Sequence, residues 1–222
     1  MSSSRERIKK LVLIALFSAL AYVCMFVFRI KVSFLTFDAK DAVMAIGSMF
    51  LGVVPGALMS LIVAFTEYIS VSDTGLYGFL MNFISSAAFA CTASVFYRRK
   101  KGINSAIIGL FLAVIVTTSV MLAANVLITP FYTGLKTADV VAMIPTLLLP
   151  FNLTKGVLNA ALVFLLYKPI TTALSRARMI DHKIEFTFNK NTVVMLILGV
   201  TLLLIAVLVF FFVLNGNFEL IK

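Results

Sequence analysis

The chain has few of the residues on which most enzymes and metalloproteins depend. Charged residues make up only 13% of its 222 residues, and there are nine acidic side chains, two cysteines, one histidine and no tryptophan. His182 lies in a charged loop, and Cys24 and Cys91 lie in apolar segments, so the sequence predicts neither a metal site nor a disulfide. Glu67 is the only acid deep in an apolar segment, which argues against a chain of carboxylates for proton transport.

Enzyme signatures are absent as well. The sequence contains no HExxH zinc motif, no GxSxG nucleophile motif and no glycine-rich phosphate-binding loop. We therefore expect no enzymatic activity and no bound cofactor. If a solute crosses the membrane, we expect the energy to come from a partner.

What the chain has in excess is apolar surface. It is 62% hydrophobic, with a mean hydropathy of +1.10, which is typical of a polytopic helical membrane protein. Its length suffices for one all-α bundle of six or seven spans, without room for a separate soluble domain. The net charge of +10 could indicate a nucleic-acid partner. The basic residues cluster in short loops between apolar runs, however, so we interpret them as topology signals.

Seven apolar segments can be drawn, at about 10–28, 39–54, 56–71, 76–97, 103–128, 145–167 and 193–214. The second and third are short and are separated by Gly52, Pro55 and Gly56, which predicts a tight helical hairpin. If the N-terminus is cytoplasmic, the inside segments hold most of the basic residues: Arg5, Arg7, Lys9, Lys10, Arg98, Arg99, Lys100, Lys101, Lys168, Arg176, Arg178, Lys183 and Lys190. The outside segments hold only Arg29, Lys31, Lys40, Lys136 and Lys222. This bias predicts a cytoplasmic N-terminus and, with seven spans, a C-terminus outside.

Lys155 lies in the middle of the sixth apolar segment, in the run LPFNLTKG. A cation within a membrane helix is costly, and it is kept where it faces a cavity and a polar partner. Asn152 and Asn159 lie three residues before and four residues after Lys155, on the same helical face. This face is therefore the first candidate for a ligand site.

Further asparagines reach a similar depth. Asn82, Asn125 and Asn152 fall, with Lys155, in the outer half of the predicted bilayer, so a shared outward-facing pocket is geometrically reasonable. Amide and ammonium groups suit a planar heterocycle with carbonyl and imide edges. The alternative is that the asparagines bond only between helices.

The outside loop 29–37 carries Phe34 and Leu35, and such apolar loop residues usually pack onto something. The loop is either a plug over its own bundle or a lid on a binding site, and the two are compatible. We expect Glu67 to reach the outer interface and Asp41 to interact with the helix dipole of the second segment.

Ala15 and Ala19 form a small-xxx-small pattern in the first segment. Small residues four apart permit close approach of another helix, either within the bundle or from a partner.

Four stretches carry a family resemblance: LPFNLTKG at 149–156, NVLITPFY at 125–132, FDAKD at 37–41 and NFI at 82–84. Over about residues 9–174 the chain resembles the substrate-binding S components of energy-coupling factor (ECF) vitamin transporters, and most closely the riboflavin-specific ones. The resemblance implies a six-helix fold with both ends cytoplasmic and an outward-facing pocket closed by the first loop. The last apolar segment is then an additional C-terminal helix. The implied organisation is an S-component domain at 1–174, a cytoplasmic linker at 175–192, and the extra helix with a short tail at 193–222.

The resemblance also implies roles for individual residues. Asn125, Asn152 and Lys155 are expected to bind the isoalloxazine head of riboflavin, with Phe34 and Leu35 covering it. Asn82, Asp38 and Tyr132 lie in the matching motifs and complete the expected ligand-binding set.

Ala15 and Ala19 are expected to contact the transmembrane coupling subunit, and two ATP-binding subunits would drive uptake through the bacterial cell membrane. The alternatives are an S component for folate, thiamine or a queuosine precursor, or a helical membrane scaffold without a transport role.

Overall fold

The computed structural model describes residues 2–27, 29–100, 102–177, 179, 190–213 and 219–220. Most of the predicted linker at 175–192 lies outside the described residues. The helices are α1 (Ser2–Val27), α2 (Lys40–Leu51), α3 (Val53–Ser70), α4 (Gly75–Lys100), α5 (Ile103–Thr133), α6 (Thr137–Ala142), the π-helix η1 (Ile144–Leu148), α7 (Leu149–Arg176) and α8 (Lys190–Val213). The strands are β1 (Ile30–Val32), β2 (Leu35–Phe37) and β3 (Glu219–Leu220).

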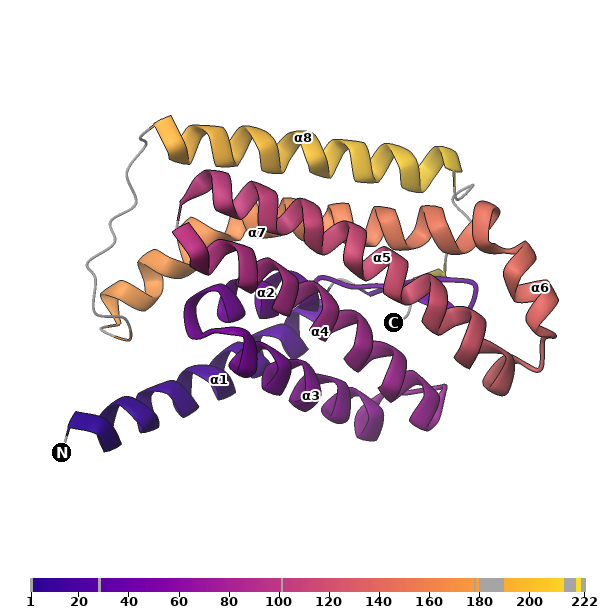
Figure 1. Cartoon of the computed structure of the whole chain (residues 1–222), viewed down its shortest axis with the longest axis horizontal. Coiled ribbons are helices and arrows are strands. Elements are labelled where there is room, and N and C mark those ends of the chain that lie inside the picture. The colour runs from indigo at the N-terminus through magenta and orange to yellow at the C-terminus, as the bar shows by residue number, and fades with distance from the viewer. Residues whose placement is uncertain are drawn as a thin grey trace.

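These elements form one elongated helical bundle (Figure 1). Six helical stretches are long and apolar enough to cross a membrane: those within α1, α3, α4 and α5, the continuous η1–α7 stretch, and α8. Together with α2 they confirm the predicted six-helix core with an additional C-terminal helix. The main core lies around α2, where Met44, Ile46 and Phe89 of α4 are almost fully buried.

α2 differs from the prediction in length. It has 12 residues rather than the expected stretch of 39–54, so it measures about 18 Å at 1.5 Å per residue. A bilayer core is about 30 Å thick, so α2 is too short to span it alone. Every residue from Lys40 to Met49 is buried, because α2 occupies the centre of the bundle with other helices around it. The strands β1 and β2 precede its N-terminal end (Figure 1).

The predicted helical hairpin of α2 and α3 is present. Gly52 joins the two helices with a φ of 115°, a conformation that favours glycine. At Gly56 a Cβ atom would lie 2.2 Å from Ser48 Oγ, so only glycine permits this close approach of α3 to α2. As α3 returns along α2, Glu67 near its end comes back beside Lys40, the first residue of α2.

Segment 30–37 is a β-hairpin rather than an irregular loop. β1 and β2 pair antiparallel with Val32 opposite Leu35, and Ser33 takes the positive φ of 56° at the turn. β3 pairs antiparallel with the other side of β1, so the sheet order is β2-β1-β3. We call β1, β2 and their turn the lid hairpin.

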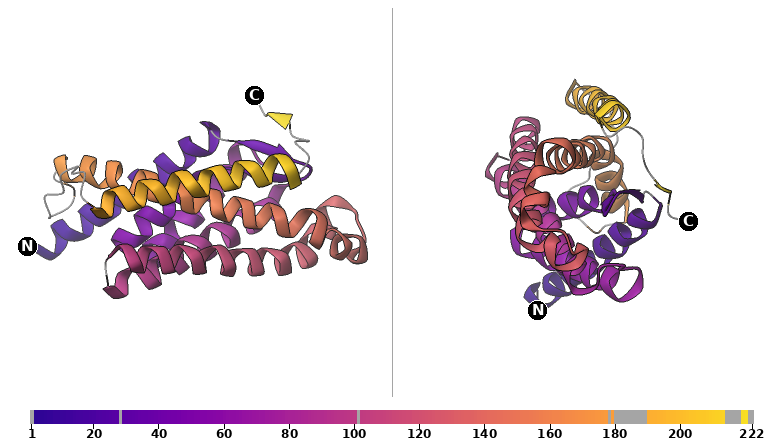
Figure 2. Two further views of the ribbon diagram at one scale, coloured as in Figure 1. Left: turned by 90° about the horizontal axis from the view of Figure 1, so that it is seen from above. Right: turned by 90° about the vertical axis from the view of Figure 1, so that its right-hand side faces the viewer.

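α8 packs along the outside of the bundle against α7 (Figures 1 and 2). The contact is close, because a Cβ atom at Gly199 would lie 2.7 Å from the Leu165 side chain and 3.1 Å from the Ala161 carbonyl oxygen. Only 11% of its most apolar window is buried within the protein, so most of α8 presents apolar side chains outward.

Candidate ligand-binding site

A cavity of about 290 Å³ lies between the lid hairpin and helices α3, α4, α5 and α7. Its wall combines apolar and polar side chains. The lining residues are Arg29, Lys31, Phe34, Leu35, Thr36, Glu67, Ser72, Asp73, Thr74, Gly78, Met81, Asn82, Ser85, Met121, Tyr132, Thr133, Phe151, Asn152 and Lys155. Six residues of the predicted ligand set are therefore brought together here: Phe34, Leu35, Asn82, Tyr132, Asn152 and Lys155.

Lys155 connects this cavity to the lid hairpin. Its Nζ donates to Asp38 Oδ2 at 2.9 Å and to the carbonyl oxygen of Thr36, in strand β2, at 3.3 Å. An ammonium group has three N–H donors. Within the described part of the chain, no hydrogen-bond acceptor takes the third, and Lys155 lines the cavity. The two bonds therefore fix the ammonium at the cavity wall while one donor remains for a ligand.

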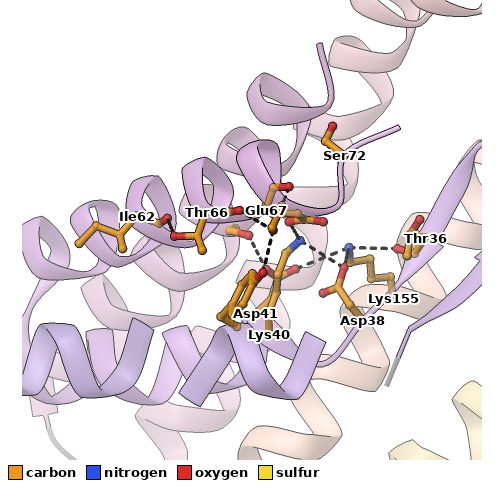
Figure 3. Close-up of polar contacts among 12 residues, drawn as sticks. Thr36, Asp38, Lys40, Asp41, Ile62, Thr66, Glu67, Ser72 and Lys155 are labelled. Atoms are coloured by element: carbon orange, nitrogen blue, oxygen red, sulfur yellow. Dashed lines mark hydrogen bonds and ion pairs between the residues drawn. The ribbon is translucent and has the colours of Figure 1, made fainter. Parts of the chain in front are cut away.

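Lys155 belongs to a buried group of five ionisable side chains that we call the charged cluster: Asp38, Lys40, Asp41, Glu67 and Lys155 (Figure 3). Lys40 Nζ lies 2.6 Å from Glu67 Oε2 and 3.5 Å from Asp38 Oδ2. Ser86 Oγ donates to Asp41 Oδ1 at 2.5 Å, and Asp41 Oδ2 lies 4.0 Å from Lys155 Nζ. The cluster joins α2, α3 and α7, because Lys40 of α2 pairs with Glu67 of α3, and Lys155 of α7 pairs with Asp38 and Asp41 at the start of α2.

The charged cluster corrects one prediction and adds to another. Glu67 does not reach the outer interface: it is buried and pairs with Lys40. Asp41 lies in the first turn of α2, where the helix dipole favours a carboxylate as predicted, and its buried side chain also accepts a hydrogen bond from Ser86 of α4. Asp38 lies just before α2, accepts a hydrogen bond from Lys155 and is not a lining residue of the cavity.

The asparagines separate into two groups. Asn152 lines the cavity; its Nδ2 donates to the Leu148 carbonyl oxygen at 2.8 Å, and its Oδ1 accepts no hydrogen bond from the described residues. Asn82 also lines the cavity and is half-buried. Asn125 does not line it: its amide donates to the Met121 carbonyl oxygen, its Oδ1 accepts from Thr129 Oγ1, and it is fully buried.

Asn159 holds the backbone that precedes and begins α2. Its Oδ1 accepts from the amide of Ala42 at 2.9 Å, and its Nδ2 donates to the Asp38 carbonyl oxygen at 3.2 Å. The predicted shared face of Asn152, Lys155 and Asn159 is therefore divided between the cavity and the structural support behind it.

Aromatic side chains form much of the apolar wall. Phe34 at the turn of the lid hairpin lies edge-on to Tyr132, with ring centroids 6.5 Å apart, and both line the cavity. Phe151 also lines the cavity and packs on Phe37 of β2, with ring centroids 4.3 Å apart. Sequence reasoning missed Phe151, which stands beside Asn152 in the LPFNLTKG run and could have been found there.

Lys40 was missed because the sequence places it among loop cations. Its position in FDAKD, between two acids at the start of an apolar segment, was the available signal. Among the described residues, no group of three histidine, cysteine or acidic side chains is placed to hold a metal ion.

Residues 9–167 match the family described as "ECF transporter, substrate-specific component". The chain belongs to this family and is a multi-pass membrane component of a transporter. It is 31% identical over 179 residues to the riboflavin transporter RibU of Staphylococcus aureus (strain TCH60), covering 76% of this chain and 93% of that protein. It also resembles the solved structure titled "Structure and mechanism of the S component of a bacterial ECF transporter", with a TM-score of 0.64 and 29% identity. That similarity covers 76% of this chain and 98% of the solved chain, and α8 lies beyond the family match.

Proposed function

We propose that the chain binds riboflavin in the cavity under the lid hairpin and serves as the riboflavin-specific subunit of an ECF importer. One observation carries the proposal: Lys155 lines the cavity and is fixed there by Asp38 and Thr36, and no acceptor among the described residues takes its third N–H donor in a hydrogen bond. The match to a riboflavin transporter over 93% of that protein's length supports the same ligand.

The polar groups along the cavity wall complement the edge of a flavin. The pyrimidine-like edge of an isoalloxazine ring presents two carbonyl acceptors on either side of one imide N–H donor. The Lys155 ammonium supplies a donor, Asn152 Oδ1 supplies an acceptor, and Asn82 supplies an amide with both. Matched donors and acceptors fix the orientation of a ring whose remaining surface is apolar.

Apolar and aromatic side chains would cover the rest of the ring system. Phe34 and Leu35 of the lid hairpin, Tyr132 and Phe151 all line the cavity. The cavity volume lies near the lower end of the range for small-molecule sites, which suits a single tight ligand. Asp38 acts through Lys155 in this arrangement, and Asn125 supports the end of α5 from outside the cavity wall.

The ECF partners would dock on α1. Ala15 and Ala19 are both exposed there, whereas Phe17 and Ser18 between them are buried. We propose that this exposed small-residue face receives the transmembrane coupling subunit, that two ATP-binding subunits drive uptake, and that the N-terminus is cytoplasmic. Co-purification of the coupling subunit with two variants tests this surface. Ala15→Leu is expected to reduce the amount of coupling subunit recovered. Leu16→Ala, on the same exposed face, is the control and is expected to leave it unchanged.

Mass spectrometry of the detergent-purified protein tests the ligand. The expected result is one riboflavin per chain, seen also as flavin absorbance. Folate, thiamine or a queuosine precursor in its place would leave the transport role intact and replace the proposed ligand. A protein that carries none of these and binds no added riboflavin would contradict the proposal.

A further inference from the structure

α8 lies outside residues 9–167, the part of the chain that matches the family, yet it contacts the lid hairpin. Phe210 near its C-terminal end lies edge-on to Phe37 of β2, with ring centroids 5.3 Å apart and planes at 77°. Phe37 packs in turn on Phe151 of the cavity wall. A line of three aromatic rings therefore connects α8, the lid hairpin and the cavity.

A second contact reaches the lid hairpin from the segment that follows α8. β3 pairs with β1, with Ile30 opposite Leu220 and Lys31 opposite Glu219. Without β3, the outer edge of β1 would be an unpaired strand edge. β1 is instead the central strand of the sheet, paired with β2 on one side and with β3 on the other.

α8 is itself anchored to the helix that carries Lys155. Gly199 allows α8 to approach α7 so closely that a Cβ atom there would overlap the Leu165 side chain and crowd the Ala161 carbonyl oxygen. α8 thus bridges α7 and the lid hairpin, the two elements whose separation would open the cavity on that side.

We infer that α8 holds the lid hairpin closed over the cavity, with Phe210 as the positioning residue that acts on the lid through Phe37. Its effect on ligand residence time rests on the proposed function, whereas its effect on the lid does not. Phe210 forms an aromatic pair with Phe37 when the lid is closed. The interaction energy of such a pair changes the equilibrium between closed and open lid by about three- to tenfold.

Hydrogen–deuterium exchange of the backbone amides at 30–37 in the ligand-free protein tests the effect on the lid. Phe210→Ala is expected to speed exchange there about three- to tenfold. Leu208→Ala is the matched control, because Leu208 is 55% exposed and lies on the same helix. Gly199→Leu should act in the same direction as Phe210→Ala by displacing α8 from α7, without touching the lid hairpin.

Riboflavin dissociation from the same proteins tests the residence time. Release is expected to be about three- to tenfold faster in Phe210→Ala, with a smaller change in the association rate. Unchanged lid exchange in both Phe210→Ala and Gly199→Leu would overturn the inference. If lid exchange responds as expected but the unmodified protein binds no riboflavin, the proposed function fails and the inference about the lid stands. If riboflavin binds normally and leaves all variants at one rate, α8 does not set the residence time of the ligand, and that part of the inference fails.

Discussion

The charged cluster and α8 belong to the same bundle but differ in polarity and in burial. The cluster places five ionisable side chains in the interior and makes each tolerable through ion pairs and hydrogen bonds from other helices. α8 has no charged residue from Asn191 to Val213, a mean hydropathy of 3.2 in its most apolar window, and few buried positions. The η1–α7 stretch, which carries Lys155, has a mean hydropathy of only 1.6 in its most apolar window, and 44% of that window is buried. Hydropathy therefore separates the helix that faces lipid from those that hold the site.

The largest effect is expected from Lys40→Met. It would leave Glu67 and Asp38 buried without a cation that they share, and removing one partner from a buried pair costs about 3–5 kcal/mol. Equilibrium unfolding in detergent should show this loss. Lys40→Met/Glu67→Gln should recover most of it, because it removes one charge of each sign. Lys31→Met is the control: Lys31 pairs with Asp73, which is 71% exposed, so the expected change is below about 1 kcal/mol. Equal losses for Lys31→Met and Lys40→Met would contradict this account of the cluster.

A smaller effect is expected from two asparagines of α7, one of which should affect stability and the other ligand binding. Asn159→Leu removes the bonds to Ala42 and Asp38 and should lower stability by about 1–3 kcal/mol, because it leaves buried polar groups unpaired. Asn152→Leu removes only a bond within its own helix and an acceptor at the cavity, so it should leave stability nearly unchanged and weaken riboflavin binding several-fold. Unfolding and riboflavin titration of both variants separate the two roles. A stability loss for Asn152→Leu as large as that for Asn159→Leu would instead favour a purely structural site.

The smallest effect is expected on the outer face of α8. Leu204 is 59% exposed on the outer face of α8, so Leu204→Ala should change stability by no more than about 0.5 kcal/mol. The same unfolding assay checks this. A loss of several kcal/mol would mean that another protein surface, rather than lipid, covers α8 in the measured state.

The fold was largely predictable because it depends on local apolar runs. The helical hairpin at Gly52 and Gly56 and the additional C-terminal helix follow from composition and spacing alone. The length of α2 did not follow, since an apolar run does not show where the lid hairpin ends and the helix begins. Strand β2 ends at Phe37, and the first helical residue is Lys40.

The site was predictable where its residues lie on one helix. Lys155 and Asn152 were found from their positions in α7, because a cation in an apolar helix must have a reason to be there. The partners of Lys155 were not found, since Asp38 lies 117 residues away and only the folded bundle brings the two together. The depth of a residue along a span does not show which way its side chain points. The sequence therefore did not show that the Asn125 side chain bonds its own helix rather than lining the cavity.

The most direct test of the central claim is a riboflavin titration of Lys155→Met/Asp38→Asn beside the unmodified protein. With its members counted as ionised, the cluster carries three carboxylates and two ammonium groups, and the double variant removes one of each, so its net charge is unchanged. A folded double variant that binds riboflavin at least about tenfold more weakly is the predicted result, because a charge-assisted hydrogen bond contributes about 1.5–3 kcal/mol. Unchanged affinity in a folded double variant would show that the Lys155 ammonium does not hold the ligand.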